Sequence, residues 1–219
     1  MGNTGISHDL LQGLKFIKAR KIISLFCAFY LINYIMVQPI FSIILPLQFK
    51  MILNFTDIQY GYIQMIIILG GLLGSILVGV LFGREEKVRK FLILGTTLVF
   101  ITMIFYVILM IPRITLFQGW GTNIYFMLLA GTLFLLSLAS TFIIVPIQAH
   151  IQKETPTQYM SRVFSIIGLL SRGGIPIGTL IYGLALEHIT LHSTMTFSTI
   201  LTILASTVVL VSILKVQKI

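Results

Sequence analysis

The chain has 219 residues, of which 57% are hydrophobic and 10% are charged, with a formal net charge of +9. A soluble domain carries about 25% charged residues because water must wet its surface, so this composition excludes a water-soluble globule. The basic residues form short clusters between long apolar stretches, without the interleaved aromatic residues of a strand-binding face, which excludes nucleic acid as the expected partner. We therefore expect an integral membrane protein whose first partner is the lipid bilayer.

The amino-terminal segment is predicted to form a short amphipathic helix on the cytoplasmic surface of the membrane. Leu10, Leu14 and Ile17 fall on one helical face, with the lysines off it, a pattern typical of interfacial helices. A disordered basic tail is the alternative. We divide the chain into a linker helix, a transmembrane bundle and a cytoplasmic tail, over residues 1–21, 22–214 and 215–219.

Six apolar stretches follow the linker. They cover residues 22–47, 58–82, 91–111, 123–148, 160–186 and 194–214. Each has about the 20 residues that a helix needs to cross a hydrocarbon core. Because every backbone polar group must be satisfied within the chain there, we predict six transmembrane helices. Thr155 is expected to cap the fifth helix, with Pro156 in its first turn.

The basic residues predict how these helices are threaded. Twelve lysine and arginine residues flank the stretches on one side, among them the basic loop between the second and third stretches. That loop contains Arg84, Lys87, Arg89 and Lys90. Only Lys50 and Arg113 flank the other side. By the positive-inside rule, both termini are cytoplasmic and the chain is a multi-pass protein of the cell membrane.

The two halves of the chain echo each other. Pro46 and Gln48 recur 100 positions later as Pro146 and Gln148. A second set, recurring 104 positions later, consists of Gly70, Gly74 and Gly79, matched by Gly174, Gly178 and Gly183. Because the first and fourth helices run in opposite directions, we predict an all-α fold of six helices arranged as a 3+3 inverted repeat. The glycines are also expected to pack helices closely or to serve gating, and chance recurrence is the alternative.

Several polar residues within the apolar stretches are candidates for a substrate pathway. Arg172 lies about a dozen residues into the fifth stretch, where a charged side chain normally faces a cavity or a partner. Snorkelling, or a polar contact between helices, is the alternative. Asn33, Gln38 and Gln64 are expected to line the same pathway, unless they only bond neighbouring helices. Pro39 and Pro176 are expected to kink their helices, for structure or for gating.

The chemistry of an enzyme or a metalloprotein is not expected. Cys27 is the only cysteine, and it lies in an apolar stretch. His188 and His192 have a spacing that suits a metal, but a site there would need a third ligand. The chain contains no nucleophile elbow, phosphate loop or zinc-helix motif. We therefore predict no catalytic residue, no metal and no cofactor.

Three segments carry a resemblance to a known family. The connection after the fourth stretch reads Pro146-Ile-Gln-Ala-His-Ile-Gln-Lys-Glu-Thr-Pro156 and continues with Arg162-Val-Phe-Ser165. The other segments are Asp9-Leu-Leu-Gln-Gly13-Leu-Lys-Phe, and the run from Leu45-Pro46-Leu47 to Tyr60-Gly61. Together they resemble the carboxy-terminal half, helices seven to twelve, of a major facilitator superfamily transporter of the macrolide-efflux-like branch. The basic loop lacks the aspartate that this family places before its arginine.

The resemblance implies a half-length secondary transporter. Its expected activity is the export of a small amphipathic molecule by alternating access, and its expected partners are that substrate and a second six-helix bundle. The second bundle is either a separately encoded half or another copy of the chain. A truncated, non-transporting remnant or a membrane scaffold protein is the alternative, because the chain begins within what would be the family's central linker.

Overall fold

The computed structural model describes residues 6–81, 88–111 and 118–216, and helices make up all the regular secondary structure of these residues. The helices are α1 (Ile6–Ala19), α2 (Lys21–Met36), η1 (Ile40–Ile44), η2 (Leu47–Ile52), α3 (Asp57–Leu81), α4 (Val88–Leu109), α6 (Gln118–Glu154), α7 (Thr157–His188) and α8 (Leu191–Val216). Six spans within them are long and apolar enough to cross a membrane. This confirms the predicted all-α fold class.

The first span is longer and less regular than its apolar stretch predicts. It continues from Lys21 to Ile52, because the π-helical segments η1 and η2 extend α2. Pro39 immediately precedes η1, and Pro46 immediately precedes η2. A proline ring cannot donate to the helical ladder and crowds the carbonyl group four residues earlier. The wider π turns therefore begin directly after each proline.

The start of α7 differs from the prediction. Pro156 is itself the N-cap residue, and no side chain caps the helix there. The Thr155 hydroxyl donates instead to the carbonyl oxygen of Ile151, at 2.6 Å, on the last turn of α6. The hydroxyl of the buried Thr155 therefore bonds to α6, which ends before it, and not to α7, which begins after it. The prediction of a Thr155 cap was wrong for this reason.

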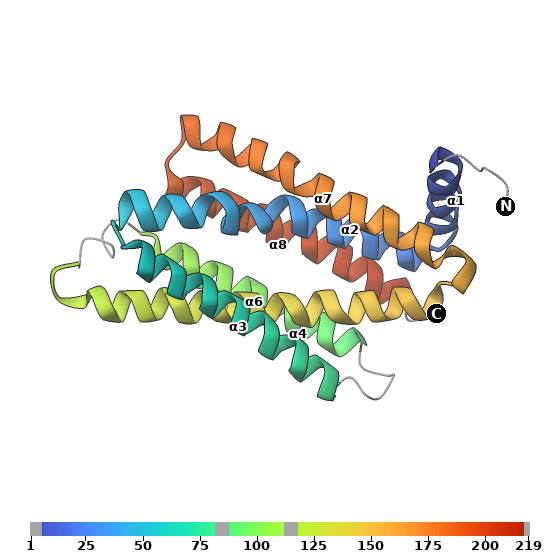
Figure 1. The fold of residues 1–219 in the computed structure, drawn as a ribbon, viewed down its shortest axis with the longest axis horizontal. Coiled ribbons are helices and arrows are strands. Elements are labelled where there is room, and N and C mark those ends of the chain that lie inside the picture. Colours follow the sequence, from blue (N-terminus) through green and yellow to red (C-terminus); the bar gives the residue numbers. More distant parts are fainter. Residues whose placement is uncertain (1–5, 82–87, 112–117, 217–219) are drawn as a thin grey trace.

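The six spans form two groups of three (Figure 1). In one group α3 and α4 pack on α6, and in the other α7 and α8 pack on α2, with α4 and α8 in contact between the groups. These contacts are the same when each helix is replaced by its counterpart in the other half, with α2 exchanged for α6, α3 for α7 and α4 for α8. The packing therefore has the two-fold arrangement of the predicted inverted repeat.

Glycine contacts repeat this symmetry at the level of single residues. A Cβ atom added at Gly70 would overlap the backbone carbonyl of Phe134, and one added at Gly174 would lie 3.0 Å from the Cβ atom of Tyr34. Gly70 and Gly174 correspond by the 104-residue offset, and Tyr34 and Phe134 correspond by the 100-residue offset. The two halves therefore use corresponding residues where α3 crosses α6 and where α7 crosses α2.

The other repeated glycines divide into two kinds. Gly74 and Gly178 are buried against α6 and α2, respectively, where an added Cβ atom would meet backbone atoms. Gly79 and Gly183 are exposed and have no atom within 4 Å of an added Cβ position. Close helix packing explains the first kind, whereas no described neighbour requires the second.

The exposed surface is largest on α3 and α7. In the most apolar 18-residue segment of each of these spans, only 22% is buried, against 44% in the corresponding segments of α4 and α6. The uncovered side chains are mostly aliphatic, and large hydrophobic residues are exposed along both helices. A surface of this kind requires lipid or another protein over it.

The helix α1 docks onto the junction between α6 and α7. The Phe16 ring stacks on the Tyr159 ring, with centroids 5.0 Å apart, and Arg20 forms an ion pair with Glu154 at 3.3 Å. Ile17 is buried in the same contact. The structure thus contains a helix within the predicted linker, and the position of that helix at the cytoplasmic membrane surface stays a prediction.

Candidate functional site

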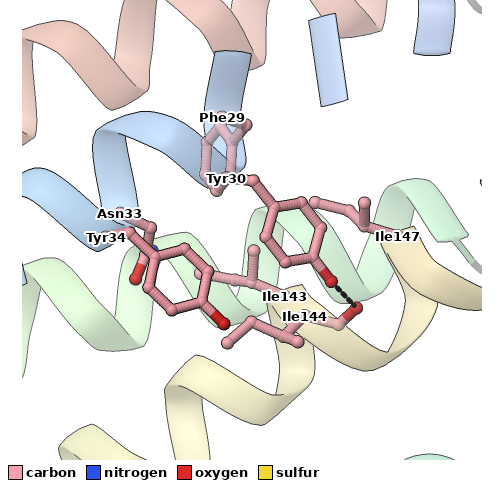
Figure 2. A pocket seen from close by; sticks show the side chains of 7 residues that line it. All are labelled: Phe29, Tyr30, Asn33, Tyr34, Ile143, Ile144 and Ile147. Atoms are coloured by element: carbon pink, nitrogen blue, oxygen red, sulfur yellow. Dashed lines mark hydrogen bonds between the residues drawn. The ribbon is translucent and has the colours of Figure 1, made fainter. Parts of the chain in front are cut away.

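A small hollow lies between α2 and α6, the central helices of the two groups (Figure 2). Its cavity volume is about 10 Å³, close to what one water molecule needs. Phe29, Tyr30, Asn33 and Tyr34 line it from α2, and Ile143, Ile144 and Ile147 line it from α6. The hollow therefore lies on the boundary between the two halves of the repeat.

Two tyrosines give this hollow its polar character. Tyr30 and Tyr34 are one helical turn apart on α2, so they share a face. Their rings are stacked, with centroids 6.1 Å apart and planes at 13°. The Tyr30 hydroxyl donates to the carbonyl oxygen of Ile144 at 3.2 Å, and Figure 2 shows both hydroxyls directed toward α6. The arrangement presents aromatic rings with hydrogen-bonding hydroxyl groups beside Asn33 and the isoleucines of α6.

The polar residues predicted for the pathway are only partly brought together. Asn33 lines the hollow, beside Tyr34. Gln38 is half-buried just beyond the end of α2, and its backbone carbonyl accepts a bond from Ser42 at 3.4 Å. Gln64 donates to the hydroxyl of Tyr60 at 2.8 Å, within α3. The hollow therefore contains one of these three residues, and the pathway role of all three stays a prediction.

Arg172 lies at the middle of α7 and is exposed. Gly174, two residues later, faces α2. Two residues correspond to about 200° around a helix, so Arg172 points away from α2 and away from the hollow. No hydrogen bond or ion pair joins Arg172 to another residue in the described part of the chain. A central arginine costs about 3 kcal/mol in the membrane, which favours a polar partner outside this bundle or snorkelling.

The predicted prolines lie in different environments. Pro39 is buried, and its Cγ atom lies 2.7 Å from where a Cβ atom on Gly178 would be. The structure thus brings two of the predicted packing residues together, one from each half. Pro176 is exposed, and α7 continues through it without a break. A gating role for either proline stays a prediction.

The basic loop is described only in part. Arg84 and Lys87 lie outside the described residues. Arg89 and Lys90 lie in the first turn of α4, and both are exposed. Within the described ranges, no group of three or more His, Cys, Asp or Glu residues could hold a metal ion.

Sequence reasoning missed a buried polar pair near the far end of the first span. The Tyr106 hydroxyl donates to the side-chain oxygen of Gln48, and both residues are buried. The amide nitrogen of Gln48 has no hydrogen-bond partner among the described residues. The recurrence of Gln48 as Gln148 indicated the repeat, but it did not indicate the hydrogen bond with Tyr106.

The Tyr30–Tyr34 pair could have been recognised from the sequence, because two tyrosines four residues apart within an apolar stretch lie on the same face of a helix.

Comparison with known protein families gives a match over most of the chain. Residues 3–179 match the family model described as Major Facilitator Superfamily. No curated protein and no solved structure matches the chain. The matched region includes α1, five of the spans in whole or in large part, and the hollow between α2 and α6. The chain therefore belongs to the major facilitator superfamily, a family of membrane transporters.

Proposed function

We propose that this chain forms one half of a secondary transporter that exports a small amphipathic molecule by alternating access. The main support for the proposal is the two-fold packing of the inverted repeat. Gly70 lies against Phe134 in the same way that Gly174 lies against Tyr34. Inverted repeats supply two arrangements of similar energy, so that a site between them faces either side of the membrane in turn.

The exposed faces of α3 and α7 support a second bundle. These counterpart helices flank α6 and α2 and are the least buried spans. Arg172 projects from the outer side of α7, where lipid alone would leave its charge without a partner. A second six-helix bundle, encoded separately or provided by another copy of the chain, would cover this surface and supply a polar group for Arg172.

The chemistry of the hollow suggests the kind of substrate. Stacked Tyr30 and Tyr34 offer an aromatic surface, Asn33 offers an amide, and the isoleucines of α6 are apolar. Ligand sites are typically apolar with a few polar groups that set orientation. A flat amphipathic molecule fits this lining once α2 and α6 move apart and enlarge the hollow between them.

The proposed orientation places the protein in the cell membrane with both termini in the cytoplasm. The clustering of lysine and arginine on one side of the spans supports it. In this orientation α1 lies at the cytoplasmic surface, where Lys15 and Lys18 are exposed beside Leu11 and Leu14. That mixture of basic and apolar side chains suits contact with anionic headgroups.

Efflux of ethidium, a flat amphipathic cation, tests the function. We expect cells that produce the chain together with its second bundle to accumulate less ethidium than cells without the chain. Tyr34→Ala should raise the half-saturating ethidium concentration by about 2- to 10-fold, because losing one aromatic contact costs about 0.5–1.5 kcal/mol. Phe197→Ala is the matched control, since Phe197 is exposed on α8 and lies outside the hollow.

The alternative makes a different prediction for the same cells. A non-transporting remnant or a scaffold would leave ethidium accumulation unchanged with either form of the second bundle, although the chain is in the membrane. Equal effects of Tyr34→Ala and Phe197→Ala on ethidium efflux would show that transport does not depend on the hollow between α2 and α6.

A further inference from the structure

Two hollows on the outside of the bundle meet at Lys90. One, of about 330 Å³, is lined by Leu81 at the end of α3 and by Lys90, Phe91 and Leu94 of α4. The other, of about 390 Å³, is lined by Lys90, Ile93, Leu94, Thr97 and Leu98. The two hollows lie side by side along α4 and share Lys90 and Leu94, and we call them together the α3–α4 groove.

The packing of the helices explains why this groove is open. α3 and α4 both pack on α6 rather than on each other. Figure 1 shows the end of α3 and the start of α4 separated. Leu81 and Leu94 are exposed on the two sides of the space between them. The groove is therefore open among the residues that the structure describes, because of how the helices pack.

The groove has the dimensions and the depth of a lipid chain. Lys90 is the third residue of the span Val88–Leu109, so its side chain reaches the level of the headgroups. The eight helical steps from Lys90 to Leu98 cover about 12 Å along the helix, and one leaflet of the hydrocarbon core is about 15 Å thick. Apart from Lys90, Thr97 is the only polar residue in the lining that the structure describes.

We infer that the α3–α4 groove binds an anionic glycerophospholipid. The Lys90 ammonium group contacts the phosphate, and one acyl chain lies along Ile93, Leu94 and Leu98. Lys90 is exposed and has no hydrogen-bond or ion-pair partner among the described residues, and it is the one basic residue in the lining that the structure describes. Negative lipids are drawn to basic side chains at this depth.

The opposite end of the repeat shows that the charge is specific to one side. The repeat makes the end of α7 and the start of α8 the counterparts of the end of α3 and the start of α4. This second region contains Glu187, and it has no Lys or Arg between residues 184 and 199. Placing the lipid in the cytoplasmic leaflet rests on the orientation under the proposed function. Binding itself does not, because it requires neither transport nor a second bundle.

Native mass spectrometry of the purified chain in neutral detergent tests the site. The chain is titrated with phosphatidylglycerol and, separately, with phosphatidylcholine of the same acyl chains. We expect the first phosphatidylglycerol to bind about fivefold more tightly, the factor that one basic residue near the surface contributes. Lys90→Gln should abolish this preference and Lys90→Arg should keep it. Lys215→Gln is the matched control, because Lys215 is an exposed cation in the last turn of α8.

Three results would overturn the inference. The first is a preference for phosphatidylglycerol that survives Lys90→Gln. The second is an equal loss of preference in Lys215→Gln, which would indicate a general effect of net charge. The third is competition by soluble glycerol 3-phosphate as effective as that by phosphatidylglycerol, which would exclude the acyl groove. None of these depends on ethidium efflux, so the lipid site and the proposed function fail separately.

Discussion

Replacing Gly70 or Gly178 by alanine is expected to destabilise the purified chain by roughly 1–3 kcal/mol, the usual effect of overpacking a tight contact. A Cβ atom at Gly70 would overlap the carbonyl oxygen of Phe134, and one at Gly178 would overlap that of Ile35. A backbone oxygen cannot rotate away as a side chain can, so the helices themselves must separate. Thermal unfolding in detergent, followed by circular dichroism, measures the effect.

The chain supplies its own controls for this experiment. Gly79 and Gly183 belong to the same repeated set, but an added Cβ atom would meet nothing within 4 Å at either position. Gly79→Ala and Gly183→Ala should therefore be neutral, or stabilising by about 0.5–1 kcal/mol through helix propensity. Equal destabilisation by all four substitutions would contradict the close crossings of α3 with α6 and of α7 with α2.

Arg172→Leu is expected to reduce ethidium efflux by the assembled transporter at least tenfold while the chain still inserts into the membrane. The substitution removes an insertion cost of about 3 kcal/mol, so the amount of inserted chain should stay the same or rise. It also leaves the polar partner in the second bundle without its charge, which in a buried pair costs about 3–5 kcal/mol. Efflux and membrane yield are measured in the same cells.

Leu169→Ala is the matched control for Arg172. Leu169 lies about one turn earlier on α7 and is 64% exposed, so it shares the outer face without carrying a charge. Its substitution should change efflux by less than about twofold, the scale of one small contact. If Arg172→Leu leaves efflux unchanged, then Arg172 is not part of the pathway or of the contact with the second bundle, and snorkelling explains its position.

The six spans and the repeat could be predicted from the sequence, because both depend on features that the sequence displays directly. Apolar length alone identifies a membrane helix, and a glycine is the sequence sign of two backbones in close approach. Gly70 and Gly174 therefore carried information on tertiary contacts. The π-helical turns after Pro39 and Pro46 could not be predicted, because an apolar stretch has the same composition whether its ladder is α or π.

The site was less accessible to sequence reasoning than the fold. The pathway role of Arg172 stays a prediction, and its direction could not be read from the sequence, because only the contact of Gly174 with α2 fixes it. The hollow needs Tyr34 of α2 and Ile144 of α6 at a set separation, which no spacing within one helix encodes. The α3–α4 groove likewise depends on the packing of α3 and α4 on α6 instead of on each other.

Cysteine accessibility tests the threading of the six spans, on which the account depends. In a Cys27→Ser background, single cysteines replace Arg89, at the start of α4, and Thr190, between α7 and α8; both positions are exposed. Intact cells are treated with a membrane-impermeant maleimide. With both termini in the cytoplasm, Thr190→Cys is labelled and Arg89→Cys is labelled only after permeabilisation. Labelling of Arg89→Cys in intact cells would contradict this threading.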